Sequence, residues 1–411
     1  MHAPQTPEAR AEAAELLNVK QCIMSTQTNR PMMGVVYDAL SGAYLMTQAE
    51  TMVDPDTYMD CLAMMTSRDQ LPTLDDRLAR YQVRPFSGRA LFSGPLPEDF
   101  QYTKGKVIIK DGVLIQGEIT KAHIGVTSNS IIQFLYKEYG SSRTSDFLTD
   151  ISFIENRWLI DRGLSIGLRD CYPKDARYKQ QVDEAIEKAR LEVAALGVKL
   201  DDPLEEEQRE KKIVGYVSAV KNLSQTLVAD NLAPDNNLAI MSDLGSSAKG
   251  SKFNIAQIIG LLGQQFIKGE RMKMTLTHGT RCLPYFEEND ASIEARGFCV
   301  RGFGPEQGLS PAEYMFHAAG SREGLMDTAV KTAETGSLHH RLVKSVEDLK
   351  VVNDGSLRNA TGIIFQYTAY EHGFEPSEMM GIPGASGGGD LVTFFNPQSL
   401  AAKINARYGY T

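Results

Sequence analysis

The residues best suited to chemistry lie in a loop of glycine, serine and lysine at positions 245–252. This loop leads into a predicted helix at 254–266. The first backbone N–H groups of a helix and its dipole attract anions, and Lys249 and Ser251 would add a positive charge and a hydroxyl. The pattern predicts contact with phosphate oxygens, but it lacks the spacing of a Walker A loop. A phosphate site and an ordinary solvated loop therefore both remain open.

Two other polar pairs have the residue types of metal ligands, and each has a simpler explanation. Asp54 and Asp56 flank a proline where a helix is predicted to begin, so we favour a cap followed by a first-turn acid. His339 and His340 would point about 100° apart on a helix, so we favour solvated surface. The five cysteines form no Cys-x-x-Cys pair, unlike a zinc ribbon or a disulfide framework. We therefore predict no metal ligand and no catalytic residue in this chain.

The 411-residue chain has a net charge of −9, with 42% hydrophobic and 23% charged residues. A negative surface excludes generic binding of nucleic acid, so any such contact must come from local patches. No apolar run reaches about 18 residues and no signal peptide is visible, so we expect neither a membrane span nor secretion. Scattered cysteines favour a reducing compartment, and the length allows roughly two to four domains.

One long helix at 310–349 dominates the predicted elements. Ser310 can cap it, Pro311 suits its first position, and Glu313 completes a capping box. No proline follows within the run, and the next stop signal is the Asn-Asp-Gly sequence at 353–355. At about 1.5 Å per residue the helix would be roughly 60 Å long, severalfold longer than an average globular helix of about 12 residues.

This helix contains three glycines and a stripe of small side chains. Gly320, Gly324 and Gly336 each cost about 1 kcal/mol relative to alanine. Small residues recur every four positions along one face: Thr328, Thr332 and Gly336, with Ala329 and Ala333 beside them. One interpretation is a buried central helix whose glycines permit close packing. The other is a helix that crosses an open space and bends.

Around this helix the sequence predicts further helices and one β-hairpin. Asp111-Gly112 between two β-branched runs is a strong hairpin signal for 106–119. Helical spacing with many charge pairs at 176–196 and 205–227 predicts two antiparallel helices joined by an acidic tip. The remaining predicted segments are helices at 6–17, 55–68, 131–139 and 146–162, and a flexible, glycine-rich linker at 381–390.

Several stretches of the chain carry a recognisable series of motifs. They are QTNRPMMG at 27–34, GLSIGLRD at 163–170, AKGSKFNIAQIIGLLGQQ at 248–265, RCLPYF at 281–286, RGFC at 296–299 and SREGLMDTAVKTAETG at 321–336, followed by RLVK at 341–344. In this order they resemble motifs of the largest subunit of cellular multisubunit DNA-directed RNA polymerases. The resemblance is closest to archaeal and eukaryotic forms and covers nearly all of residues 1–375. We expect no counterpart for residues 376–411.

The resemblance implies an α+β fold, mainly helical with a small β-rich pore region, that forms the multidomain core of a polymerase largest subunit. It implies an ordered set of regions: the end of the active-site barrel region at 1–17, a pore domain at 18–173, a funnel helical hairpin and secondary-channel segment at 174–280, and a cleft segment at 281–375. Residues 310–349 would be the bridge helix of that cleft. A flexible C-terminal segment would follow at 376–411.

The resemblance also implies roles for individual residues. The positions that would contact the template base and the nascent base pair, where only small side chains fit, are Thr328, Thr332, Ala333 and Gly336. The hinges on which the helix would bend are Gly320, Gly324 and Gly336. The residues that would line the secondary channel, through which nucleotides enter, are Lys249, Ser251, Gln264 and Gln265.

The family holds its catalytic Mg²⁺ on an NADFDGD motif, which this sequence does not contain. We therefore expect Mg²⁺ at the active site of a complex, held by residues outside this chain, and we expect the chain alone to be inactive. The implied partners are the DNA template, the RNA transcript, nucleoside triphosphates, the second-largest subunit, and chains that carry the NADFDGD motif and the trigger loop.

The expected function is DNA-templated RNA synthesis, with this chain positioning the template base and the incoming nucleotide. A split subunit suggests a large DNA virus or an unusual archaeal-type lineage. The expected location is therefore intracellular: the nucleus or cytoplasm, or a viral factory or virion. One alternative is a non-catalytic, truncated paralogue that acts as a scaffold. The other is an autonomous phosphate-binding enzyme that uses the Lys249 loop, although no base, nucleophile or metal cluster accompanies that loop.

Overall fold

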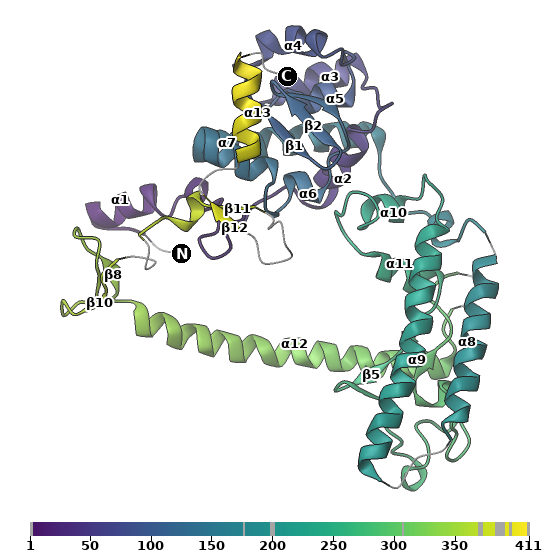
Figure 1. Cartoon of the computed structure of the whole chain (residues 1–411). Coiled ribbons are helices and arrows are strands. Elements are labelled where there is room, and N and C mark those ends of the chain that lie inside the picture. The colour runs from purple at the N-terminus through teal and green to yellow at the C-terminus, as the bar shows by residue number, and fades with distance from the viewer. Residues whose placement is uncertain are drawn as a thin grey trace. The chain divides into compact units, whose positions relative to one another are not determined.

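The computed structural model describes residues 3–175, 177–197, 202–305, 308–368, 373–382, 391–393 and 397–408 (Figure 1). The chain forms two compact units. Unit 1 comprises Met1–Leu164, Gly245–Lys249 and Thr368–Thr411, and unit 2 comprises Ser165–Leu244 and Gly250–Tyr367. Helices predominate in the described parts of both units, and the described sheets are small. The prediction of a mainly helical α+β chain is confirmed.

Unit 1 contains helices α1 (Pro7–Glu15), α2 (Tyr37–Met46), α3 (Pro55–Met64), α4 (Leu74–Arg80), α5 (Gly88–Ser93), α6 (Lys121–Ile124), α7 (Ile131–Arg162) and α13 (Pro397–Tyr408). Its strands are β1 (Tyr102–Lys104), β2 (Val107–Lys110), β3 (Val113–Gln116), β11 (Met380–Ile382) and β12 (Leu391–Thr393), and its 3₁₀ turns are Val19–Cys22, Leu71–Thr73 and Pro376–Glu378. Helices α2, α3 and α5 pack against α7. The core includes the fully buried rings of Phe92, Phe100 and Phe147.

Helix α7 covers both helices predicted at 131–139 and 146–162. A single residue, Gly140, breaks the helical backbone with a φ of 82° and a ψ of 177°, a conformation open mainly to glycine. The hydroxyl of Thr144 then donates to the Gly140 carbonyl at 2.9 Å. The non-helical break is therefore a single residue, whereas the sequence predicted a break over residues 140–145.

Strands β1, β2 and β3 form an antiparallel sheet in sequence order. The predicted hairpin is confirmed, with Asp111 and Gly112 at the turn between β2 and β3. Their φ angles are 48° and 68°, and two positive φ angles are what a type I′ turn requires. A Cβ added at Gly112 would lie 2.2 Å from the carbonyl oxygen of Pro97, so the turn needs glycine there.

The described parts of 376–411 form the β11–β12 hairpin and α13. Sequence patterning does not predict this helix. The ammonium of Lys403 on α13 lies 3.1 Å from the Glu138 carboxylate and 5.2 Å from the ring centroid of Tyr139, so α13 is bound to α7. Most of the predicted linker, residues 383–390, lies outside the described residues.

Unit 2 contains helices α8 (Arg177–Ala195), α9 (Pro203–Asp230), α10 (Asn237–Met241), α11 (Lys252–Ile259) and α12 (Pro311–Val346). Its strands are β4 (Gly263–Gln264), β5 (Phe266–Ile267), β6 (Glu270–Arg271), β7 (Phe298–Cys299), β8 (Lys350–Val351), β9 (Leu357–Arg358) and β10 (Ile364–Gln366), and its 3₁₀ turns are Leu168–Cys171, Thr277–Gly279 and Glu294–Arg296. Strand β4 pairs with β7, β5 pairs with β6, and β9 lies between β8 and β10.

Helices α8 and α9 lie side by side (Figure 1), which confirms the predicted helical pair. The buried residues of each helix recur every three or four positions, the spacing of one helical face. On α8 the buried row is Tyr178, Val182, Ile186, Ala189 and Val193, and on α9 it includes Ile213, Val217, Val220 and Val228. At the acidic tip, the Asp202 carboxylate caps α9 by accepting from the N–H of Leu204 at 2.9 Å.

The helix predicted at 254–266 is wrong in its second half, because α11 ends at Ile259. Gly260 leaves the helical region with a ψ of −112°, and Gly263 has a φ of 79°. The chain then pairs as a strand, with Gln264 opposite Phe298. Strand pairing in a buried setting, rather than helix propensity, decides the conformation of this segment.

Candidate functional site

The candidate site is built on α12, a helix of 36 residues that Figure 1 shows as one continuous element. The helix predicted at 310–349 is therefore present, although it ends at Val346. The predicted capping box is confirmed at its start. The hydroxyl of Ser310 accepts from the N–H of Glu313 at 3.3 Å, and the Glu313 carboxylate accepts from the N–H of Ser310 at 2.8 Å.

Glu313 also ties the first turn of α12 to the chain before it. The residue is 7% exposed, and its other carboxylate oxygen accepts from the backbone N–H of Arg301 at 3.1 Å. The Cys299 thiol lies 3.7 Å from the Glu313 carbonyl oxygen. Burial, followed by the Glu313 charge, raises the pKa of Cys299 to about 12. The root of α12 is thus a buried, hydrogen-bonded joint.

A second set of contacts supports the following turns of α12. The ring of Phe316 stacks on that of Phe286 with centroids 6.1 Å apart. About two turns further on, the Glu323 carboxylate accepts from the backbone N–H of Lys268 at 2.7 and 2.9 Å. This bond joins α12 to the β5–β6 hairpin. Sequence reasoning missed the Glu323 contact, because its partners are 55 positions apart and no periodic pattern links them.

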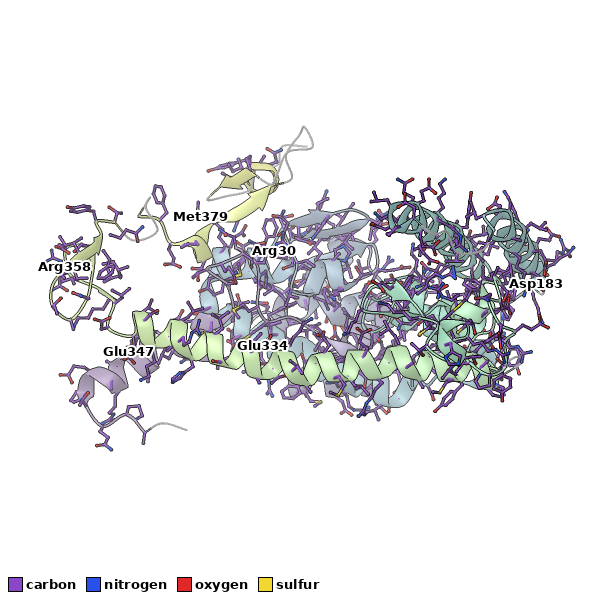
Figure 2. The ribbon with its side chains drawn as sticks, turned by 90° about the horizontal axis from the view of Figure 1, so that it is seen from below. Arg30, Asp183, Glu334, Glu347, Arg358 and Met379 are labelled. Atoms are coloured by element: carbon purple, nitrogen blue, oxygen red, sulfur yellow. The ribbon has the colours of Figure 1, made fainter. Side chains whose placement is uncertain are left out.

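Beyond these turns α12 has no packed neighbours in the described chain. Every residue at 324–346 is exposed. Glu334, which Figure 2 labels on this stretch, is one example. The interpretation of α12 as a buried central helix is therefore wrong for this chain. Helix propensity and contacts along the helix itself, rather than packing against the described chain, therefore hold this stretch in helical form.

The three glycines predicted as hinges have different surroundings. A Cβ added at Gly320 would lie 3.4 Å from the carbonyl oxygen of Phe266, which is an ordinary contact. At Gly324 and Gly336 an added Cβ would meet no described atom within 4 Å. Packing inside the chain therefore does not require glycine at these two positions. Their role as hinges stays a prediction.

The predicted stripe of Thr328, Thr332, Ala333 and Gly336 lies on the exposed stretch. The hydroxyl of Thr328 donates to the carbonyl of Gly324 at 2.9 Å, and the hydroxyl of Thr332 donates to the carbonyl of Thr328 at 2.8 Å. Both hydroxyls are thereby turned onto the helix backbone, a pattern that is often associated with bending. The stripe presents a low surface against which a flat group could lie.

The predicted phosphate loop is divided between the two units. In unit 1 the Lys249 ammonium lies 5.3 Å from the ring centroid of Tyr37, a cation–π distance. In unit 2 the Ser251 hydroxyl donates to the Asn254 side chain at 2.8 Å. The first N–H of α11 donates to the Asp243 carboxylate at 2.6 Å. A carboxylate of the chain itself therefore binds the helix N-terminus at which phosphate is predicted.

Gln264 and Gln265 hold the chain around the root of α12. Gln264 is buried, and its amide donates to the carbonyls of Gln265 and Arg296 at 2.9 and 2.8 Å. The side-chain oxygen of Gln265 lies 3.3 Å from Nδ1 of His317 on α12. Both side chains therefore serve packing in unit 2, and their place along a nucleotide channel stays a prediction.

The polar pairs considered as metal ligands have other roles. The Asp54 carboxylate caps α3 by accepting from the N–H of Asp56 at 3.2 Å, as favoured from the sequence. His339 and His340 are exposed. Across the part of the chain that the structure describes, no group of three or more His, Cys, Asp or Glu side chains is placed to hold a metal ion. In the same part, none of the helices combines the length and apolar character needed to cross a membrane.

Three consecutive stretches of the chain match known families. Residues 22–171 match RNA polymerase Rpb1, domain 3, residues 199–299 match domain 4, and residues 308–393 match domain 5. The chain belongs to the family of largest subunits of multisubunit RNA polymerases. The third match contains α12 and continues to residue 393. The expectation that residues 376–411 have no counterpart is therefore wrong for 376–393.

Individual relatives extend over most of the chain. It is 33% identical over 417 residues to a probable DNA-directed RNA polymerase II subunit RPB1 homolog of Invertebrate iridescent virus 6, a match that covers 93% of this chain and 40% of the relative. It is 32% identical over 400 residues to the DNA-directed RNA polymerase subunit Rpo1N of two Halobacterium salinarum strains, covering 92% of this chain and 39% of each relative. The chain thus spans about two fifths of the length of these curated relatives.

Proposed function

We propose that this chain forms part of the active centre of a DNA-directed RNA polymerase and takes part in DNA-templated RNA synthesis. In this proposal α12 is the bridge helix, which positions the template base and the incoming nucleotide. The observation that carries the proposal is the stripe of small residues on an exposed helix that is anchored at its root. The matches to three consecutive largest-subunit domains support it.

The side chains of the stripe are small enough to leave room for a base pair beside the helix. Its members Thr328, Thr332, Ala333 and Gly336 are exposed and carry at most three heavy side-chain atoms. A base pair is flat and rigid, so a helix beside it must avoid long side chains on the facing side. Bending at Gly324 and Gly336 would let the helix move without repacking a core, because neither glycine has a packed neighbour among the described residues.

The remaining regions would form the path of the nucleotide. We place a pore domain at 18–173 and a funnel with its secondary-channel segment at 174–280, each within the unit that holds most of it. Lys249, Ser251, Gln264 and Gln265 would lie along this path. Lys249 is an exposed residue, which supports its assignment better than that of Ser251, whose hydroxyl is already bonded to Asn254.

The metal of this chemistry would be held elsewhere. The described residues do not fit Mg²⁺, because they contain no suitable group of carboxylates, and octahedral Mg²⁺ requires hard oxygen ligands. We propose that the metal and the trigger loop are supplied by residues outside this chain, and that the second-largest subunit, DNA, RNA and nucleoside triphosphates complete the centre. The complex would work in the nucleus or cytoplasm, or in a viral factory or virion.

A scaffold function without catalysis is the other candidate. The relatives bear the names of polymerase subunits, which favours the polymerase over the scaffold.

The proposal is tested by Ala333→Leu in a reconstituted polymerase. Leucine forms helices nearly as well as alanine, and Ala333 is exposed, so the chain should fold and assemble normally. Overpacking against a fixed neighbour costs about 1–3 kcal/mol, so elongation should slow by about tenfold or more. The measurement is the elongation rate on a defined template.

Glu334→Leu is the matched control. Glu334 lies about 100° or more around the helix from every member of the stripe, and it is equally exposed. Its elongation rate should stay near that of the wild type. Normal elongation by Ala333→Leu, or equal slowing by both variants, would remove the stripe from the active centre.

A further inference from the structure

The chain that follows the β8–β10 sheet is attached to unit 1 at two separate points. It belongs to unit 2 up to Tyr367 and to unit 1 from Thr368 onward. Beyond Thr368 the described elements are the 3₁₀ turn Pro376–Glu378, the β11–β12 hairpin and α13. The 3₁₀ turn makes the first attachment, and α13 makes the second.

The first attachment is a hydrogen bond from Asn29. Its side-chain amide donates to the carbonyl of Pro376 at 2.8 Å, and Pro376 is buried. Asn29 has a φ of 53°, a conformation that asparagine adopts more readily than most residues. The amide of Gln133, buried on α7, donates to the Asn29 carbonyl at 2.8 Å. The donor of the first attachment is therefore itself held in place by α7.

The second attachment is an ionic notch, formed by Asp99, Glu138 and Tyr139, that receives Lys403 of α13. The Lys403 ammonium lies 3.1 Å from the Glu138 carboxylate, 3.5 Å from the Asp99 carboxylate and 5.2 Å from the Tyr139 ring centroid. The Tyr139 hydroxyl donates to the Asp99 carboxylate at 2.6 Å. Two negative charges and an aromatic face all attract an ammonium group.

The apolar side chains of α13 are only partly buried. Leu400, Ile404 and Tyr408 recur every four residues and so lie along one face, yet they are between 44% and 66% exposed. A helix of 12 residues is marginally stable by itself in water, so α13 depends on its contacts with unit 1. The charge of Lys403 therefore carries a large share of its attachment.

The two attachments should respond differently to salt. Lys403 and Asp99 are both partly exposed, so dissolved ions can screen the contact between them. The bond from Asn29 to the buried Pro376 carbonyl involves no net charge, and salt has little effect on it. The ionic notch can therefore open while the first attachment stays closed.

We propose that the described residues between Pro376 and Tyr408 form a strap, with a stable attachment at Asn29 and a releasable one at the ionic notch. Release detaches α13 and frees the carboxylates of Asp99 and Glu138, while the β11–β12 hairpin stays in place. The attachment of α13 thereby becomes dependent on ionic strength. The inference goes beyond the proposed function, because it concerns other residues and no step of RNA synthesis.

Hydrogen exchange of the full chain, followed by mass spectrometry, tests the releasable attachment. The amides of α13 should exchange faster as sodium chloride rises from about 0.01 to 1 M, because the Debye length falls from about 30 to 3 Å. Lys403→Gln should speed this exchange about tenfold at low salt and remove most of its salt dependence. Lys403→Arg keeps a cation that also binds aromatic faces, so it should behave like the wild type.

Asn405→Gln is the matched control for the notch, since Asn405 is exposed on the same helix and the change removes no charge. It should not speed the exchange of α13 or alter its salt dependence.

Asn29→Gly tests the stable attachment. Glycine adopts a positive φ without strain, so this change removes the side-chain amide and leaves the loop intact. Exchange of the amides at 379–382 should rise about fivefold at every salt concentration. The proposal is overturned if Lys403→Gln leaves the exchange of α13 unchanged, if Lys403→Arg exchanges as fast as Lys403→Gln, or if salt speeds residues 379–382 as much as α13. These outcomes leave the proposed function untouched, since no polymerase activity is measured.

Discussion

Removal of the Glu313 carboxylate should free the first turns of α12 from unit 2. This side chain accepts two backbone hydrogen bonds, from Ser310 at 2.8 Å and from Arg301 at 3.1 Å. It is 7% exposed, so water cannot readily replace the lost acceptor. Glu313→Ala should therefore leave two N–H groups with poorer partners.

The expected cost follows from these two bonds. A hydrogen bond to a charged group contributes about 1.5–3 kcal/mol, and loss of a helix cap costs about 1 kcal/mol. Because these contributions overlap at Ser310, we expect Glu313→Ala to lower the free energy of local unfolding by about 3 kcal/mol. Glu313→Gln keeps one acceptor oxygen and should lose about half as much.

Hydrogen exchange of the backbone amides at 314–320, followed by mass spectrometry in the full chain, measures this free energy directly. Glu334→Ala is the control, because Glu334 is exposed on the same helix (Figure 2) and surface changes lie within about 0.5 kcal/mol. If Glu313→Ala changes exchange no more than Glu334→Ala, the buried joint does not hold α12. An equal loss in Glu313→Gln and Glu313→Ala would contradict the requirement for two acceptors.

Two further predictions concern the rest of the chain. Gly324→Ala and Gly336→Ala should each stabilise α12 by about 1 kcal/mol, seen as slower amide exchange, yet slow elongation in a reconstituted polymerase; unchanged elongation would exclude a hinge. Glu155 is buried without a described hydrogen-bond partner for its carboxylate, and burial raises its pKa well above the ordinary value. The folded state then keeps a proton that the unfolded state loses above about pH 4.3, so the free energy of unfolding should fall with rising pH by up to about 1.4 kcal/mol per unit until the raised pKa is passed. Glu155→Gln should remove this fall, measured by urea unfolding with the fluorescence of the single tryptophan, Trp158; an identical pH slope would refute it.

The features predicted correctly are those set by residues that lie close together in the sequence. The capping box of Ser310 and Glu313 and the Asp111-Gly112 turn are set by residues at most three positions apart, and both are confirmed. The helical pair α8–α9 follows from apolar spacing over several turns. In each case the free energy that decides the conformation arises between neighbours in sequence.

Segments whose conformation depends on residues far away in the sequence were predicted less well. The apolar run after Gly260 has helical spacing, but it pairs as β4 with β7, more than 30 residues later. Helix α13 carries a weak pattern and is bound through Lys403 to Glu138, 265 positions away. Such contacts leave no periodic trace in the sequence.

The candidate site also combines features that the sequence predicts with features that depend on tertiary contacts. By itself the sequence determined the long helix, its cap, and the stripe of Thr328, Thr332 and Ala333, because 3.6-residue periodicity fixes which residues share a face. Only the tertiary structure decided that this face is exposed and that Gln264 is buried. It also decided that Asp243 occupies the N-terminus of α11 and that α13 binds to α7. The physical reason is that burial and charge pairing depend on which segments fold against each other, and composition along the chain does not record that.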